Sequence, residues 1–407
     1  MGLLRSRMIA TGQQYPKQFW LLFWGLMIST VGSSMIWPFL MIYVNQRLNL
    51  PLATATTLMS VNAVCGLVFA FIAGPVTDRL GRKWVMAVSL AANGLGYLMM
   101  SQANSFVAFA FIMAWNGSFQ PLYRVGADAM MADLIPAKQR IDAYSLLRTS
   151  SNVGVALGPV IGGFIAGRSY TIAFLLAATG LITYSLLVTF LARETLPHGD
   201  GTLPRLPERL GGYDRVWKDR KFVTFSLNYT LTQICAALIW VLLGVYAYQN
   251  FHVTENHYGF IPTTNAILVI CFQLSVTQIS KRYPPLRAMA IGALFYALGV
   301  GSVAFGQGFW GFWLSMLIVT FGELISSPTA TSLAANMAPA DMRGRYMSIY
   351  GLTWGVAVGI GPVLGGLLSD NFGPEYIWYG GLIIGLISAF GFMMMARRST
   401  KIKSAAA

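Results

Sequence analysis

Long apolar stretches, separated by short polar turns, dominate the chain from residue 19 to residue 396. A helix that crosses a lipid bilayer needs about 20 predominantly apolar residues. The pattern therefore predicts an all-α polytopic membrane protein. Its twelve transmembrane helices are expected at residues 19–44, 54–76, 84–102, 105–132, 143–166, 170–191, 222–250, 256–279, 287–306, 310–335, 345–369 and 374–396.

The longest polar stretch, residues 192–221, is rich in Pro, Gly and charge, and it leaves six predicted helices on each side. It predicts an N-terminal half at 1–191, a linker at 192–221, and a C-terminal half with a short basic tail at 222–407. The halves also repeat, because residues 135–167 align without gaps on residues 338–370. Such a repeat is typical of transporters whose substrate site lies between two halves.

Composition agrees with a membrane environment, since 56% of the residues are hydrophobic and only 10% are charged. The net charge of +14 does not indicate nucleic acid as a partner, because the basic residues lie at the ends of apolar stretches. Of the 28 Lys and Arg residues, all but Arg47, Arg124, Arg148 and Arg168 fall on the side of the termini and the linker. This bias predicts cytoplasmic termini in the plasma membrane.

Several other classes of protein lack their sequence signals here. Cys65, Cys235 and Cys271 all lie in apolar stretches without a second ligand at metal-binding spacing, so we expect no metal site. No phosphate-binding loop of the ATP-driven pumps occurs, and no paired catalytic residues point to an enzyme. We expect a protein without cofactor that acts as a monomer.

Ionisable residues inside predicted helices are candidates for function, because a charge in the bilayer is costly. Glu323 lies near the middle of residues 310–335, where an acid can load and release a proton near neutral pH. Its alternative role is a structural hydrogen bond to a neighbouring helix. Arg124 and Asp128 stand four residues apart on one helix face and predict an ion pair, either switchable within a cavity or permanently structural. Asp128 is the second candidate for proton coupling.

Other polar and aromatic side chains inside the spans are candidates to line a substrate cavity, with helix packing as the alternative for each. They are Gln120, Asn62, Trp37, Asn228, Tyr229, Gln233, Trp240, Asn265 and Trp354, together with Arg124. Gln120 and Glu323 occupy the same position of the repeat, which favours a central location for both. The dipeptide at Trp37 and Pro38 predicts a kink in the first helix.

Two glycine patterns stand out. The segment GPVTDRLGRK at 74–83 joins the second and third helices. Close helix packing is expected from small residues in the fifth helix and at the same positions of the repeat. These are Gly154, Gly158, Pro159, Gly162 and Gly163, and then Gly361, Pro362, Gly365 and Gly366.

Together these motifs resemble those of the major facilitator superfamily. The segment 74–83 fits its signature G-x-x-x-D-R-x-G-R-K, and the fifth helix fits G-x-x-x-G-P-x-x-G-G, which is associated with exporters of that family. The stretch GELISSP at 322–328 resembles one found in some proton-coupled multidrug exporters. The C-terminal half has no copy of the signature, since ISKRYPPLR stands in its place.

The resemblance implies a cytoplasmic gate in the signature loop. Asp78 would meet the N-terminal end of the helix at 345–369, and Arg79 or Arg82 would pair with Asp133. Gly74 would permit close helix contact and Gly81 the turn. The leading hypothesis for function is proton-coupled export of small apolar or amphipathic compounds. Uptake of a sugar, organic acid or peptide, and translocation of a lipid-linked substrate, remain as alternatives.

Overall fold

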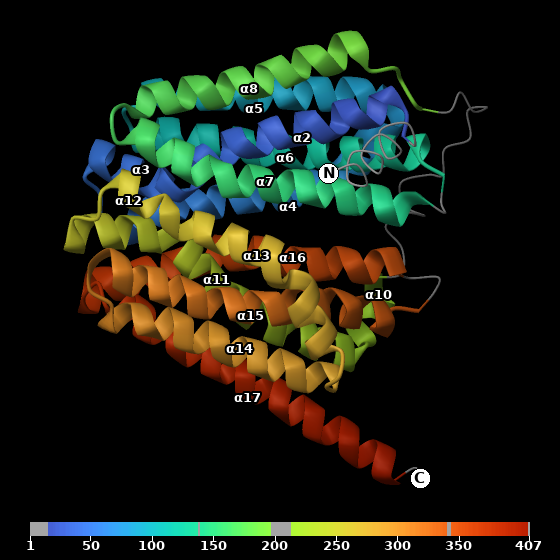
Figure 1. Ribbon diagram of the computed structural model, residues 1–407, viewed down its shortest axis with the longest axis vertical. Helices are drawn as coiled ribbons and strands as arrows, with labels where there is room; N and C mark the ends of the chain where they lie inside the picture. Colours follow the sequence, from blue (N-terminus) through green and yellow to red (C-terminus); the bar gives the residue numbers. More distant parts are fainter. Residues whose placement is uncertain (1–14, 137–138, 197–212, 340–342, 406–407) are drawn as a thin grey trace, which may run out of the picture.

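The computed structural model describes residues 15–136, 139–196, 213–339 and 343–405, and in these residues every regular element is a helix. Two bundles lie against each other, with α2 to α8 in one and α11 to α17 in the other (Figure 1). We call them the first and the second bundle. Most of the predicted linker, residues 197–212, lies outside the described residues.

The first bundle begins with α2, which breaks at Trp37–Phe39 into the short 3-10 helix η1 and continues as α3, so the predicted kink is confirmed. Proline at the first turn of η1 explains the break, because it has no N–H to give to the preceding turn. The helices of this bundle are α2 (Lys17–Ile36), α3 (Leu40–Leu48), α4 (Leu52–Leu80), α5 (Arg82–Gln102), α6 (Phe106–Leu134), α7 (Arg140–Ala166) and α8 (Tyr170–Leu191).

The second bundle follows the short helix α10 (Tyr213–Lys218). Its helices are α11 (Arg220–Phe251), α12 (Glu255–Tyr258), α13 (Phe260–Ser280), α14 (Pro285–Ser302), the 3-10 helix η3 (Val303–Phe305), α15 (Gly308–Met337), α16 (Arg343–Phe372) and α17 (Tyr376–Ala405). The largest buried cluster joins the bundles, because it takes residues from α3, α4 and α6 and from α11, α16 and α17.

Eleven helical segments of the described residues are long and apolar enough to cross a membrane. With α2 and α3 as one span and α12 and α13 as another, they match eleven of the twelve predicted spans. The twelfth is α6, which is as long as α4 but carries Arg124, Asp128 and Asp133. It packs between α4 and α5, so neighbouring helices surround much of this polar helix.

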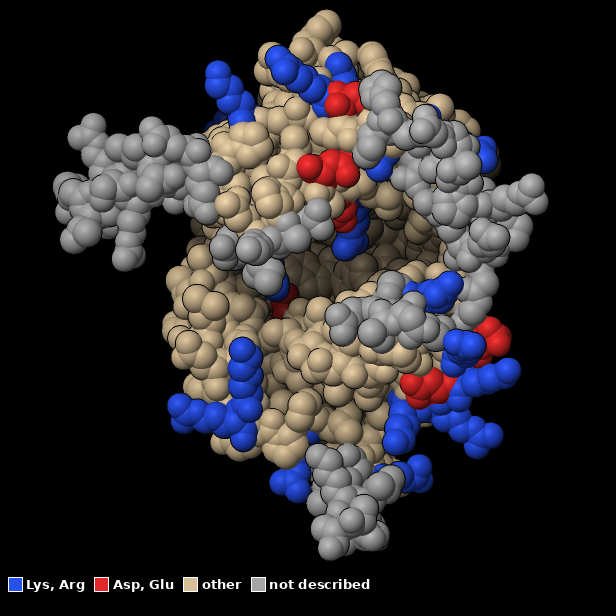
Figure 2. All heavy atoms as spheres, turned by 90° about the vertical axis from the view of Figure 1, so that its right-hand side faces the viewer, with Lys and Arg blue, Asp and Glu red and all other residues tan. Residues whose placement is uncertain are grey.

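The two ends of the molecule differ. At the end on the right of Figure 1, a deep hollow opens between the bundles, and charged side chains of both signs lie inside it (Figure 2). We call this the open end; it carries the α4–α5 turn. At the opposite end, which we call the closed end, α3 and α12 bring the bundles together.

Candidate functional site

Three polar side chains form an exposed stripe on α6. Gln120, Arg124 and Asp128 are each exposed, while Leu122, Gly126 and Met130, which follow them at a spacing of two residues, are buried. The spacing of four residues places the three side chains on one helix face. The predicted ion pair is not formed in this structure, since no contact of that kind joins Arg124 to Asp128 among the described residues. The stripe therefore presents a cation and an anion side by side without a salt bridge between them.

Glu323 is half-buried on α15 and is held by a neighbouring helix. The amide of Asn265 on α13 donates to its Oε2 at 2.8 Å and to the hydroxyl of Thr320 at 2.9 Å. Glu323 is also within the electrostatic reach of Arg148, an exposed residue of α7 in the first bundle.

The other candidates for the cavity wall differ in burial. Asn228 and Tyr229 are buried in the second bundle, where Asn228 donates to the carbonyl of Ser388 at 2.9 Å and Tyr229 stacks on Tyr350. Asn62 is half-buried and donates to the carbonyl of Met113 within the first bundle. Half-buried side chains that are not hydrogen-bonded in the described structure are Trp37, Gln233 and Trp240, and Trp354 is exposed.

The glycine motif of α7 faces two neighbours. A Cβ added to Gly154, Gly158 or Gly162 would meet α2 of the same bundle, at Thr30, Ser34 and Met35 respectively. A Cβ on Gly163 would instead lie 2.5 Å from the carbonyl oxygen of Glu255 on α12, in the second bundle. Adjacent glycines thus permit backbone contact within one bundle and across to the other.

The repeat in α16 has the same arrangement. Gly361 and Gly365 face α11 of their own bundle, while a Cβ on Gly366 would lie 2.6 Å from the Cα and N of Ala53 on α4. Pro159 and Pro362 lie inside the α7 and α16 helices, between these glycines. The first glycine of each pair therefore serves its own bundle and the second serves the contact between bundles.

The contact between α4 and α16 loosens along its length. At Gly359 an added Cβ would lie 3.2 Å from the Cβ of Ala63, and at Gly355 it would lie 3.7 Å from the side chain of Leu67. At Gly351, and at Gly74 on α4, nothing lies within 4 Å. The two helices therefore form a wedge that is shut at the closed end and separated at the open end.

Polar contacts also tie the bundles at the closed end. The buried carboxylate of Glu255 accepts from the hydroxyl of Tyr170 on α8 at 2.9 Å and from the amide of Gln46 on α3 at 3.5 Å. The hydroxyl of Thr263 on α13 donates to the carbonyl of Ala156 on α7 at 2.9 Å. Each of these bonds must break if the bundles part at this end.

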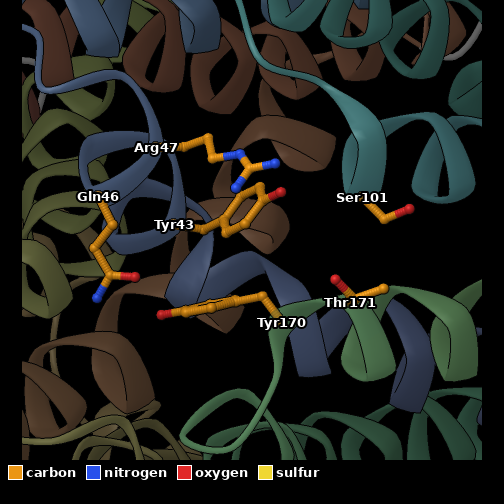
Figure 3. Close-up of a pocket in the computed structure, with 6 residues that line it drawn as sticks. All are labelled: Tyr43, Gln46, Arg47, Ser101, Tyr170 and Thr171. Atoms are coloured by element: carbon orange, nitrogen blue, oxygen red, sulfur yellow. The ribbon is translucent and has the colours of Figure 1, made fainter.

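A pocket of about 330 Å³ lies beside these contacts in the first bundle (Figure 3). Its wall is formed by Tyr43, Gln46, Arg47, Ser101, Tyr170 and Thr171. The ring of Tyr170 lies below Tyr43 and Arg47, and the hydroxyl of Tyr43 donates to the carbonyl of Met100 at 3.2 Å. Gln46 and Tyr170 therefore belong both to this pocket and to the contact with Glu255.

The predicted gate residues gather at the open end, within the first bundle. The Nε of Arg82 lies 3.1 Å from Oδ2 of Asp133, so Arg82 forms the predicted ion pair. Arg79 is exposed and has no ion pair in the described structure. Gly81 makes the turn with a φ of 91°, which favours glycine. Asp78 lies in the last turn of α4, and its side chain is outside the described part of the structure.

Glu194, which follows α8, contacts the α4–α5 turn and was not among the residues predicted from the sequence. Its carboxylate accepts from the backbone N–H groups of Arg82 at 2.9 Å and Lys83 at 3.2 Å, at the start of α5. A carboxylate in this position satisfies the free N–H groups of a helix and complements its dipole. Since Glu194 follows α8 in a polar segment, only its place just after a predicted helix could have drawn notice.

Two bundles of membrane-spanning helices, with a charged hollow between them that is shut at one end, define a membrane transport protein. The chain belongs to the Major Facilitator Superfamily, whose profile matches residues 22–234 and 225–406. A chain named an uncharacterized MFS-type transporter, YqjV of Bacillus subtilis (strain 168), is 24% identical over 406 residues, covering 95% of this chain and 96% of that relative.

Other relatives carry functional names. A Na(+), Li(+), K(+)/H(+) antiporter of Planococcus maritimus is 25% identical, covering 89% of this chain and 91% of its own. Multidrug resistance protein MdtH of Escherichia coli O1:K1 / APEC is 24% identical, covering 82% of each chain. Among solved structures, a POT family transporter in complex with 5-aminolevulinic acid is 17% identical with a TM-score of 0.81, covering 95% of this chain and 97% of that one. Since the chain belongs to this superfamily, and relatives in it are named as a transporter and an antiporter, the prediction that the chain is not an enzyme is confirmed.

Proposed function

We propose that this protein exports small apolar or amphipathic compounds in exchange for protons, as a monomer in the plasma membrane with cytoplasmic termini. It would work by alternating access, and Glu323 and Asp128 would bind the protons. The observation that carries the proposal is the environment of Glu323. This acid is half-buried among apolar helices, and an amide from α13 holds one of its oxygens.

The proposal assigns different tasks to the two acids. Glu323 lies in apolar surroundings, where the neutral form of a carboxyl group costs less than the charged form. Loss and gain of its proton therefore change the charge within the second bundle. Asp128 lies on the exposed stripe of α6 with Arg124 one turn away, so it can meet both protons and cationic substrates.

The class of substrate follows from the chemistry of these side chains. Several aromatic rings among the candidate residues of the cavity wall suit compounds that are largely apolar, and the acids Glu323 and Asp128 suit a positive charge on them. The printed name of the relative MdtH and the motif GELISSP support multidrug substrates. The alternative is uptake of a sugar, organic acid or peptide by symport, in which protons and solute enter together.

The test is transport by purified protein in liposomes with an imposed pH gradient. A hydrophobic fluorescent cation such as ethidium serves as the probe. We expect Glu323→Gln to abolish movement driven by the gradient while equilibrium binding of ethidium persists. Asp214→Asn is the matched control, because Asp214 is a surface acid on α10 that pairs with Lys218. Undiminished gradient-driven movement by Glu323→Gln would overturn the role of Glu323.

A second candidate function is exchange of alkali cations for protons, which the printed name of the Planococcus maritimus relative favours. The same liposomes separate the two functions. Addition of Na⁺, Li⁺ or K⁺ should leave the pH gradient unchanged if the proposal holds, while ethidium should dissipate it. Dissipation by the alkali cations alone would replace the proposed substrate class by these ions.

A further inference from the structure

Asp370, near the end of α16, binds the first turn of α4 in the other bundle. Its two carboxylate oxygens accept from the backbone N–H groups of Leu52 at 3.2 Å and Ala53 at 2.8 Å. The residue before α4 is Pro51, which provides no side-chain cap. The free N–H groups at the start of α4 therefore take their acceptor from a residue more than 300 positions away.

The approach of Asp370 depends on the glycine one turn before it. Because Gly366 has no Cβ, the backbones of α16 and α4 come close enough for the carboxylate to reach the end of the helix. A negative charge at a helix N-terminus is also favoured by the helix dipole. The contact thus combines two hydrogen bonds, a charge–dipole attraction and backbone packing at one point between the bundles.

The contact belongs to one state of a transport cycle. The wedge between α4 and α16 is shut at Gly366 and separated at Gly351, so Asp370 is engaged while the opposite end is open. If the bundles rock to open the closed end, the start of α4 must leave the end of α16. The two hydrogen bonds of Asp370 would then be lost.

We propose that Asp370 is the latch that holds the closed end shut in the state that is open at the other end. The helices α4 and α16 run antiparallel, and each carries an aspartate in its last turns, Asp78 and Asp370. The resemblance to the superfamily implies that Asp78 meets the start of α16 when the open end shuts. In each cycle the contact of Asp370 with the start of α4 would therefore break as the contact of Asp78 with the start of α16 forms, and the reverse. The inference rests on alternating access, and it needs neither proton coupling nor a particular substrate.

Distances between spin labels, measured by pulsed electron paramagnetic resonance in lipid nanodiscs without substrate or pH gradient, test the latch. In a background without Cys65, Cys235 and Cys271, one label pair at exposed positions Thr171 and Tyr376 reports on the closed end. A second pair at exposed positions Trp84 and Tyr283 reports on the open end. Two populations are compared, molecules in which the bundles have parted at the closed end and molecules in which they are in contact there. We expect Asp370→Asn to raise the ratio of the first population to the second about five- to tenfold, as for loss of a charged helix cap.

The matched control is Asn371→Ala, since the amide of Asn371 bonds to the carbonyl of Leu367 in its own helix. Asp370→Glu keeps the carboxylate and should keep most of the closed population, which separates the latch from a folding defect. Asp78→Asn should shift both distances in the opposite direction. Unchanged distances in Asp370→Asn, or a shift no larger than that of Asn371→Ala, would overturn the latch. Because these readouts need no transport, the latch can fail while proton-coupled export stands, and the reverse.

Discussion

The two ends of the contact between the bundles are built on different principles. At the closed end, bonds run from one bundle to the other, from Asp370 to the start of α4 and from Tyr170 to Glu255. At the open end, the charged residues of the α4–α5 turn bond within the first bundle, through Arg82 and Asp133. The gate residues Arg82 and Asp133 are therefore already paired within the first bundle, although α16 of the second bundle is separated from α4 at this end.

The largest effect is expected from closing the approach of the backbones at the closed end. Gly366→Val places a side chain where a Cβ alone would lie 2.6 Å from the backbone of Ala53. Because backbone atoms move less readily than a flexible side chain, we expect the state that is shut at the closed end to be destabilised by about 1–3 kcal/mol, the usual cost of overpacking. The label pair at the closed end measures this change.

Gly351→Val is its counterpart, because nothing lies within 4 Å of Gly351 in this state. It should leave the closed end shut. An equal response of the two valine variants would mean that the wedge between α4 and α16 does not govern the state of the transporter.

An effect of comparable size is expected at the open end, on the stability of the fold. Arg82→Ala removes the ion pair with Asp133 and leaves that carboxylate with the hydroxyl of Thr195 at 3.0 Å. Loss of one charged hydrogen bond costs about 1.5–3 kcal/mol. We therefore expect a lower thermal midpoint in detergent, with the distance at the closed end unchanged.

Arg79→Ala sharpens the same comparison, since Arg79 is exposed and forms no ion pair in the described structure. Its thermal midpoint should match that of the unchanged protein. A loss of stability from Arg79→Ala as large as that from Arg82→Ala would show that the two arginines share the task.

The smallest effect concerns a single hydroxyl at the closed end. Tyr170→Phe deletes the donor to Glu255. We expect this change to destabilise the state that is shut at the closed end by about 1 kcal/mol. Tyr43→Phe is the control in the same pocket, because the hydroxyl of Tyr43 bonds to Met100 within the first bundle. Equal distances at the closed end in the two variants would remove Tyr170 from the contact between bundles.

The sequence predicted the architecture and part of the gate for clear physical reasons. Apolar stretches must be long enough to span lipid, so the length of each helix is written into composition. The pairing of Asp133 with Arg79 or Arg82 was implied by the resemblance to the superfamily signature, and the structure forms it with Arg82. The direction of each glycine could not be predicted, since Gly162 and Gly163 are identical in chemistry and face different bundles.

The sequence did not single out Asp370, Glu255 and Glu194. Acids at helix ends are common, and most of them simply face water. Their partners are backbone N–H groups and neutral side chains, which leave no charge pattern in the sequence. The reverse happened at Arg124 and Asp128, where spacing predicts a pair that the structure leaves open. Asn228 also looked like a cavity residue, although its amide completes a buried contact with α17.

The mid-point contact between α4 and α16 makes the pair a lever. The hydroxyl of Ser60 bonds to the carbonyl of Gly359, and beyond this point the helices separate. At about 1.5 Å per residue, Gly359 stands about 16 Å from Asp370 and about 24 Å from Arg343 along the helix axis. A rigid tilt about this fulcrum would therefore move the far arm roughly one and a half times as far as the near arm. A small displacement of the helices at the closed end would therefore produce a larger separation of the bundles at the open end.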